Sequence, residues 1–264
     1  MKISIFFLFI SFSVASANDT IRIIASDSIP PYVMSQDKLD SDLPGLQIEI
    51  INSIFNLLGQ KTSWKLMPNN RMIVQYKSKK VDAALNLPFM NATHTGYASD
   101  PIVEYKNCVI GSSSIQKTWE KELKELKILG HQRADIIYRD VFTDYDFKSD
   151  KYNEVTSQKT LAYHLINNRT DIVLSDYLVF SYFAKTFFEN QLRKKDLVCL
   201  KEIKSPRSIS LKSKALRDSF NKGLEKIKAD GTYKKIITKY YKRFTAIEPQ
   251  SSQEVRAKFI FAQN

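Results

Sequence analysis

One short pattern occurs twice in the chain, and it constrains the fold more than any other feature of the sequence. Residues 71–78 have a helical pattern, and the polar pair Lys79-Lys80 leads from them to an apolar stretch at 81–85 with an aspartate near its start. Residues 160–167 also have a helical pattern, and a polar turn leads from them to the apolar stretch Asp171–Leu174. A helix, a polar turn and a buried strand form the repeating unit of parallel sheets covered by helices. Two such units predict an α/β protein made of two similar lobes.

The C-terminal part predicts two amphipathic helices. The first, Ser213–Lys228, places apolar side chains on one face, and Asp230-Gly231 ends it as a turn. The second begins near Tyr233 and repeats apolar residues at positions i, i+3, i+4, i+7 and i+8. Both helices are therefore expected to pack one face against a core. Two further helices are predicted at Gly45–Leu58 and Thr118–Leu126, and an irregular region is predicted at Tyr138–Tyr152.

The order of these patterns predicts that the chain leaves the first lobe and later returns to it. A chain of 264 residues is longer than one typical core requires. The apolar run around Cys108–Gly111 is predicted to be the first crossing between the lobes, and Pro206–Leu211 is predicted to be the return. Two crossing strands would form a hinge, and opposed sheet edges would form a cleft. The predicted regions are a first lobe at 20–110 and 207–245, a second lobe at 112–204, and a C-terminal tail at 246–264.

The first 17 residues have the features of an export signal. Lys2 precedes the apolar run Ile3–Val14, and Ala15-Ser16-Ala17 fits the small-residue cleavage site. The run is shorter than a bilayer requires, so a membrane anchor is the weaker alternative. No cysteine stands directly after the cleavage site, and a lipid anchor is therefore not expected. These features predict a periplasmic protein released after cleavage behind Ala17.

The formal net charge of +12 does not point to nucleic acid. The lysines are spread over several predicted helices and are not interleaved with aromatic residues in a stripe, and no zinc finger, basic zipper or RNA-binding motif is present. A solvated surface is the favoured explanation. A bias toward anionic ligands or toward an anionic envelope surface is the alternative.

Cysteine and histidine usage predicts a protein without a metal site. Cys108 and Cys199 each lie in a predicted strand, and in an oxidising compartment they could form a disulfide or stay as buried thiols. The three histidines are isolated, and no CxxC motif or Cys/His cluster occurs. No metal and no other cofactor is therefore expected.

Six segments in order along the chain resemble the small-solute (family 3) extracytoplasmic binding proteins. The resemblance implies the two-lobe, type II periplasmic-binding-protein fold: two largely parallel sheets flanked by helices and joined by a two-strand hinge. It also implies a monomer that delivers a small solute to an ABC permease or a membrane sensor. The segments are Pro30-Pro31-Tyr32, Gly45–Gly59, Lys80–Leu85, Ser99-Asp100-Pro101, Asp171–Tyr182 and Lys228–Tyr241.

The resemblance assigns ligand contacts to two residues. Tyr32 matches the aromatic residue that follows the proline pair and forms an apolar wall of the cleft, although a core position is the alternative. Asp176 matches the second-lobe carboxylate that holds a ligand's ammonium group. A carboxylate directly after a buried strand is costly without partners, so an exposed position beside the cleft is expected. A helix N-cap is the second role open to Asp176.

The usual clamp for a ligand carboxylate departs from the family pattern. No arginine or lysine occurs between Val81 and Tyr105, and the Gly-Thr pair of the second lobe is replaced by residues that follow Gly130. Arg71 and Arg133 are the candidate replacements, because a guanidinium binds a carboxylate through two parallel hydrogen bonds. Asn86 and Thr93 are candidate neutral hydrogen-bonding groups, with an ordinary loop role as the alternative.

Three functions fit these patterns. The leading one is capture of a small polar solute, amino-acid-like or anionic, for import or sensing. The second is an enzyme on the same scaffold, since relatives include dehydratases; Asp176, Asp135 and His94 would be its acid–base candidates, but no motif couples them. The third is a partner-binding module whose cleft has lost its ligand. No catalytic residue is predicted.

Overall fold

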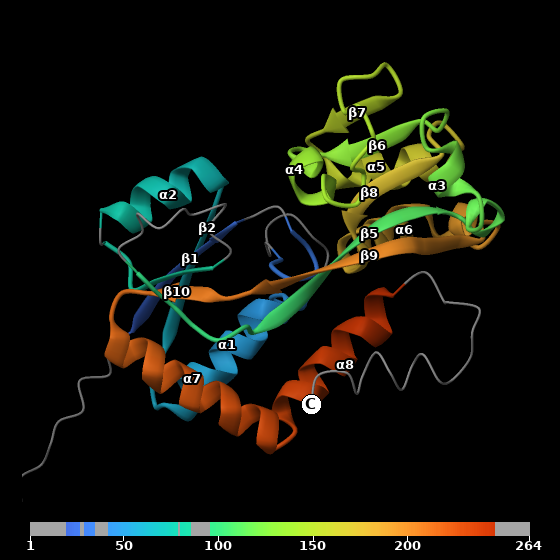
Figure 1. Cartoon of the computed structure of the whole chain (residues 1–264). Coiled ribbons are helices and arrows are strands. Elements are labelled where there is room, and N and C mark those ends of the chain that lie inside the picture. Colours follow the sequence, from blue (N-terminus) through green and yellow to red (C-terminus); the bar gives the residue numbers. More distant parts are fainter. Residues whose placement is uncertain (1–19, 27–28, 35–41, 79, 86–95, 246–264) are drawn as a thin grey trace, which may run out of the picture.

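The computed structural model describes residues 20–26, 29–34, 42–78, 80–85 and 96–245 (Figure 1). Their strands form two five-stranded sheets. Sheet A has the order β2-β1-β3-β10-β4. Its strands are β1 (Ile21–Ser26), β2 (Thr62–Met67), β3 (Ala83–Leu85), β4 (Tyr97–Ala98) and β10 (Ile209–Leu211). Strand β1 pairs in parallel with β2 and β3, while β10 is antiparallel to its two neighbours.

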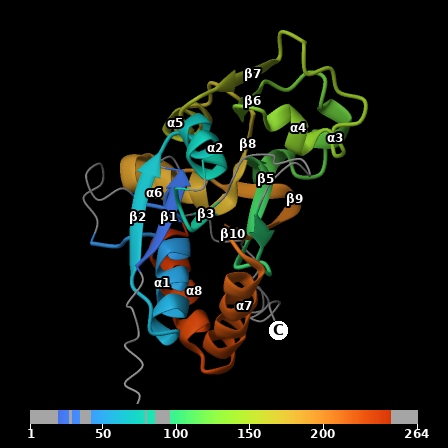
Figure 2. The same ribbon diagram turned by 90° about the vertical axis from the view of Figure 1, so that its left-hand side faces the viewer.

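Helices cover both faces of sheet A, and together they make the first lobe. They are α1 (Leu46–Leu57), α2 (Asn69–Lys77), α7 (Lys214–Ala229) and α8 (Thr232–Phe244). Apolar residues of α1, α7 and α8 share one core with alternate residues of β1. Met72 and Tyr76 of α2 pack with Ile24 of β1 on the opposite face. Figure 2 shows α1, α7 and α8 gathered below the sheet, with α2 apart from them.

Sheet B is the centre of the second lobe and has the order β7-β6-β8-β5-β9. Strands β6, β7 and β8 are parallel to one another, and β5 is antiparallel to β8 and β9. The strands are β5 (Val103–Ser112), β6 (Ile128–His131), β7 (Tyr152–Val155), β8 (Ile172–Asp176) and β9 (Leu197–Arg207). The helices are α3 (Trp119–Glu122), α4 (Ala134–Tyr138), α5 (Gln158–Ile166) and α6 (Tyr177–Leu192), and a 3₁₀ turn spans Ser113–Ile115.

Two long strands carry the chain between the lobes. Strand β5 runs from the first lobe into sheet B, and β9 returns beside it with Val103 opposite Arg207 and Ser112 opposite Leu197. Strand β10 then begins two residues after β9 ends. Figure 1 shows β5 and β9 passing side by side from one sheet to the other. Cys108 of β5 and Cys199 of β9 form a disulfide, with their Cα atoms 5.4 Å apart.

The repeated unit predicted from the sequence is confirmed, and its aspartates have the same role in both copies. Asp82 accepts a hydrogen bond from the backbone amide of Arg22 at 2.9 Å, and Arg22 belongs to β1, the parallel neighbour of β3. Asp171 accepts one from the backbone amide of Lys127 at 2.8 Å, just before β6, the parallel neighbour of β8. Each carboxylate therefore ties the start of its strand to the start of the adjacent strand.

The predicted helix at Thr118–Leu126 is wrong in extent, because only Trp119–Glu122 is helical. Within this stretch Trp119 and Leu126 are buried and the charged residues are exposed. So few apolar contacts do not hold a longer helix, since helices depend on packing of an apolar face. The irregular region predicted at Tyr138–Tyr152 is confirmed except at its ends, because Tyr138 belongs to α4 and Tyr152 to β7. Its aromatic residues Phe142 and Tyr145 are buried in the second lobe.

The predicted export signal and C-terminal tail lie outside the described residues. Within the part of the chain that the structure describes, no helix has the length and apolar character needed to cross a membrane. The same part of the chain contains no group of three or more histidine, cysteine, aspartate or glutamate side chains arranged to hold a metal ion.

Candidate functional site

The carboxyl ends of the parallel strands bring the described candidate residues to the edges of the two sheets. Tyr32 follows β1, and Arg71 lies in the first turn of α2, directly after β2. Arg133 follows β6, and Asp176 is the last residue of β8. Open α/β sheets bind ligands beyond these ends of their strands. Asn86 and Thr93 lie outside the described residues, so their candidate roles stay predictions.

Asp176 joins the two lobes through its carboxylate. Its Oδ2 accepts a hydrogen bond from the Tyr32 hydroxyl at 3.2 Å and one from the backbone amide of Lys106 at 2.9 Å. Its Oδ1 accepts from the backbone amides of Leu178 at 3.0 Å and Val179 at 2.9 Å, which makes Asp176 the N-cap of α6. The contact with Tyr32 shows that the carboxyl end of β8 meets the segment at 29–34, which follows β1.

The expectation of an exposed Asp176 is wrong, because the residue is only 7% accessible. Burial raises the pKa of its carboxyl group to about 6, against the opposing effect of the four hydrogen bonds. A carboxylate offers about four lone-pair positions. All four are used by donors of this chain, so a ligand ammonium would have to displace one of them. The buried position is therefore stabilised by the N-cap role that the sequence left open.

Tyr32 is as buried as Asp176. Its ring stacks on Tyr105 of β5 with centroids 4.2 Å apart, and the Tyr105 hydroxyl donates to Gln47 of α1 at 3.1 Å. Burial, with the nearby charge of Asp176, raises the pKa of the Tyr32 hydroxyl well above its ordinary value. The hydroxyl therefore stays protonated and acts as a donor. Tyr32 is thus buried in the core at the junction of the lobes, held in place by α1 and β5, which is the alternative position that the sequence left open.

The segment that carries Tyr32 is fixed to the start of α1. The backbone amide of Leu46 donates to the carbonyl of Pro31 at 2.9 Å, and that of Gln47 donates to the carbonyl of Tyr32 at 2.9 Å. Gly45 directly precedes α1 beside the Tyr32 segment, and its backbone has a φ of 118°. A Cβ atom at Gly45 would lie 2.6 Å from the Tyr32 carbonyl oxygen and 2.9 Å from the Met34 nitrogen. Only glycine permits this close approach of two backbones.

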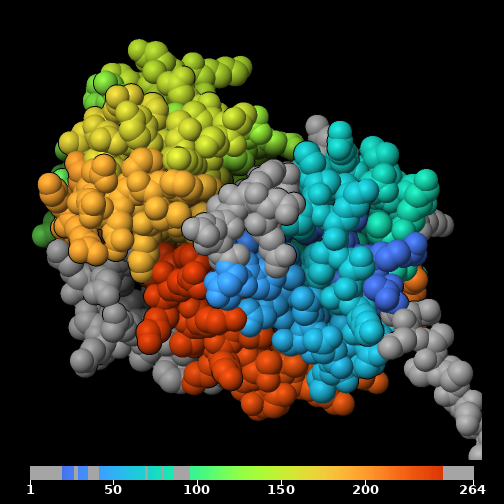
Figure 3. All heavy atoms as spheres, turned by 180° about the vertical axis from the view of Figure 1, so that it is seen from behind, coloured from blue at the N-terminus to red at the C-terminus, as the bar shows by residue number. Residues whose placement is uncertain are grey.

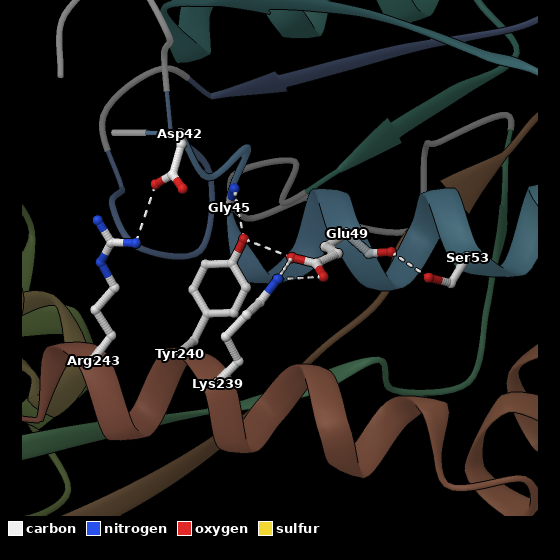
Figure 4. A network of polar contacts seen from close by, with 7 residues as sticks. All are labelled: Asp42, Gly45, Glu49, Ser53, Lys239, Tyr240 and Arg243. Carbon is white, nitrogen blue, oxygen red and sulfur yellow. Dashed lines mark hydrogen bonds and ion pairs between the residues drawn. The ribbon is translucent and has the colours of Figure 1, made fainter. Parts of the chain in front are cut away.

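Helix α8 supports the same segment from the other side (Figure 4). The Tyr240 hydroxyl accepts a hydrogen bond from the Gly45 amide at 3.1 Å and donates to Glu49 at 3.0 Å. Lys239 forms an ion pair with the same Glu49 carboxylate. Arg243 pairs with Asp42 at 3.1 Å. Helix α8 is thus connected through α1 to the segment that carries Tyr32.

The two arginine candidates lie at opposite lobes and differ in their surroundings. Arg71 is exposed, and within the described chain it has no ion pair. Arg133 is exposed too and has a left-handed backbone with φ of 66°. Its backbone amide donates to Glu154 at 2.9 Å, and Glu154 also accepts from Tyr152 at 2.6 Å. The structure brings Tyr32 and Asp176 into contact but shows no contact between the arginines.

Sequence reasoning missed three groups around Asp176. The Lys106 backbone amide carried no sequence signal, because any residue except proline supplies one. Tyr105 is recognisable only as an aromatic residue in a strand. Tyr241 is on the predicted apolar stripe, yet burial and the charge of Asp176 raise the pKa of its hydroxyl. A tyrosine on a helix stripe gives no indication of a polar neighbour.

Residues 21–243 match the family model of bacterial extracellular solute-binding proteins, family 3. The chain belongs to this family. The probable ABC transporter extracellular-binding protein YckB of Bacillus subtilis is 27% identical over 168 residues, a match that covers 59% of this chain and 56% of YckB. The matched region thus spans little more than half the length of that relative.

Solved structures share the family 3 architecture. The arginine-, lysine-, histidine-binding protein ArtJ from Geobacillus stearothermophilus has a TM-score of 0.62 at 16% identity, covering 88% of this chain and 97% of that one. An arginine 3rd transport system periplasmic binding protein from Legionella pneumophila has a TM-score of 0.62 at 20% identity, covering 84% and 99%. These similarities show the two-lobe type II periplasmic-binding-protein fold that the sequence predicted.

Proposed function

We propose that this family 3 protein captures a small polar solute between its two lobes in the periplasm, by hinge closure about β5 and β9. The observation that carries the proposal is the pair of crossing strands, which join two sheets beside the contact between Tyr32 of the first lobe and Asp176 of the second. Two covalent connections allow rotation of one lobe against the other, and the binding free energy of the solute drives closure. No chemical step is required.

The charged groups favour a solute with an anionic group, such as the carboxylate of an amino acid. Asp176 uses its four acceptor positions within the chain, so it positions Tyr32 and α6 and does not offer an unoccupied carboxylate. Arg71 presents an exposed guanidinium at the edge of sheet A. Arg133 lies at the corresponding edge of sheet B. We propose that Arg71 contacts the anionic group, and that Arg133, Asn86 and Thr93 are further contacts.

Delivery to a partner follows from the same closure. A closed, solute-loaded monomer presents a different surface from the open form, which an ABC permease or a membrane sensor recognises. An enzymatic role lacks support in the described chain, because Asp176 is held by four donors and Asp135 pairs with Arg139 at 3.3 Å. The third acid–base candidate, His94, lies outside the described residues.

A thermal-shift screen over amino acids, polyamines, organic acids, short peptides and sugars tests the proposal. A solute at about one hundred times its dissociation constant stabilises the folded state by about 2.7 kcal/mol, and we expect a rise in Tm of roughly 5–10 °C for one class. Arg71→Ala should weaken binding of that class about tenfold or more while leaving the solute-free Tm unchanged, because the side chain is exposed.

The matched control is Lys77→Ala, which removes an exposed cation from the last turn of the same helix. It should leave both the Tm and the solute affinity unchanged. If both variants lose solute affinity equally, Arg71 is not a specific ligand contact. A screen without any shift would contradict solute capture and favour a cleft that has lost its ligand.

A further inference from the structure

Basic residues are concentrated on α7 and α8 and the residues that flank them. Residues 212–245 contain eleven basic and three acidic residues, whereas the much longer segment 96–207 contains eighteen basic and sixteen acidic ones. Most of the formal net charge of +12 therefore comes from α7 and α8 and their flanks. The sequence predicts scattered lysines, because the basic positions are spread along two helices. The fold gathers them by packing α7 and α8 together as neighbours.

The charged side chains of the two helices point to solvent. The apolar stripe of each helix is buried in the first-lobe core, with Phe220 and Leu224 from α7 and Ile236 and Tyr240 from α8. The basic residues occupy the opposite faces and are exposed, which defines a basic face on α7 and α8. Figure 3 shows these helices as the orange and red band along the lower edge of the molecule. The exposed basic residues are Lys214, Lys222, Lys226, Lys228, Lys234, Lys235, Lys239, Lys242 and Arg243.

Lys222 and Lys226 of α7 and Lys235 and Lys242 of α8 are among the lysines of this face that have no ion pair within the described chain. Other members of the face do have partners, as Lys239 and Arg243 pair with residues of α1 and the loop before it. The four lysines therefore leave a local positive charge that the protein does not neutralise. Such a patch attracts an anionic surface at distances up to about 8 Å at physiological salt.

We propose that the basic face on α7 and α8 docks on the anionic phospholipid surface of the membrane. Clusters of four or more lysines or arginines on a helix surface are attracted to acidic lipid headgroups. Lys222, Lys226, Lys235 and Lys242 carry ammonium groups, which are strongly hydrated point charges suited to a fluid surface of many anions. The exposed large apolar side chains of the described chain are Leu57, Val74, Tyr97, Ile136 and Phe187, and none lies on α7 or α8. The basic face thus lacks the aromatic or aliphatic anchors that protein interfaces use as hot spots.

Docking by this face leaves the candidate site accessible. Helices α7 and α8 cover a face of sheet A, whereas the described candidate residues follow strands of sheets A and B, beyond the carboxyl ends of those strands or at them. A loosely held protein would move along the membrane plane and meet a membrane-embedded partner by a two-dimensional search. The inference goes beyond solute capture and holds whether the partner is a permease or a sensor.

Sedimentation with protein-free vesicles tests the inference. We expect the protein without its predicted export signal (residues 18–264) to bind vesicles with roughly 30% phosphatidylglycerol at about 0.1 M salt, to be released at about 0.5 M salt, and not to bind pure phosphatidylcholine. Replacing Lys222, Lys226, Lys235 and Lys242 together by glutamine should reduce the bound fraction at least about tenfold. These side chains are exposed, so the far-UV spectrum and the Tm should stay unchanged.

The matched control carries the same change in net charge on the second lobe. It replaces the exposed residues Lys117, Lys121, Lys124 and Lys194 by glutamine, and its binding should stay within about twofold of the parent protein. An equal loss in the control would mean that overall charge is responsible and would overturn the proposal of a specific face. Failure to bind protein-free anionic vesicles would overturn it too, and would point to an acidic protein as the partner.

Discussion

Replacing Gly45 by alanine is expected to lower the free energy of unfolding by about 3 kcal/mol, because two costs combine. The backbone has φ of 118°, a conformation that residues with a Cβ atom rarely adopt. The added methyl group would also lie 2.6 Å from the Tyr32 carbonyl oxygen, and this neighbour is backbone that cannot rotate away. The segment carrying Tyr32 must then separate from α1. Chemical denaturation measures the change in unfolding free energy directly.

Gly59→Ala is the matched control for this prediction. Gly59 also has a positive φ, of 73°, but a Cβ atom there meets nothing within 4 Å. The control should cost only about 1 kcal/mol from backbone strain. If both variants lose the same stability, the contact between the Gly45 backbone and the Tyr32 segment has no energetic role. If Gly45→Ala also weakens solute binding, the support of Tyr32 by α1 is functional.

Asp176→Ala should destabilise the protein by about 3 kcal/mol near neutral pH. The change removes the N-cap of α6, which is worth about 1 kcal/mol. It also leaves the Lys106 amide and the Tyr32 hydroxyl without their acceptor in a buried region, at about 1–3 kcal/mol for an unsatisfied group. Ser213→Ala is the control, since Ser213 caps α7 through a single hydrogen bond to the Leu216 amide. Its expected cost is about 1 kcal/mol.

The pH dependence of that cost distinguishes Asp176 from an ordinary cap. Burial raises the folded-state pKa to about 6 from an ordinary value of 3.8. The stability contributed by this carboxyl group is therefore fully present below about pH 4, and it is lost as pH rises through about 6. The cost of Asp176→Ala should be larger at pH 5 than at pH 8 by about 1 kcal/mol. The cost of Ser213→Ala should not vary. A constant cost for Asp176→Ala would show that the carboxyl group titrates at an ordinary pKa.

Much of the fold was accessible from local patterns in the sequence. The repeated helix, turn and strand predicted two α/β lobes, and the aspartate near the start of each strand proved to bind the neighbouring strand. The helices α7 and α8 followed from strong apolar periodicity. The sequence predicts a longer helix than α3, because charged residues at helical spacing indicate a helix without showing whether its apolar face packs against a core.

The candidate site was only partly accessible from sequence. Tyr32 and Asp176 were singled out separately, but 144 residues separate them and their contact depends on the packing of the two lobes. The burial of Asp176 depends on backbone donors, which leave no trace in a sequence. The need for glycine at position 45 also leaves no trace in the sequence, because it arises from contact with an earlier segment of the chain. Tertiary contacts, and not local pattern, determined these features.

Small-angle X-ray scattering tests closure of the lobes most directly. The protein is measured without solute and with the solute that gives the largest thermal shift. Saturating solute should reduce the radius of gyration, because the lobes rotate together about β5 and β9. The Arg71→Ala variant should show the same reduction only at higher solute concentration. Identical scattering curves with and without a solute that demonstrably binds would contradict capture by hinge closure.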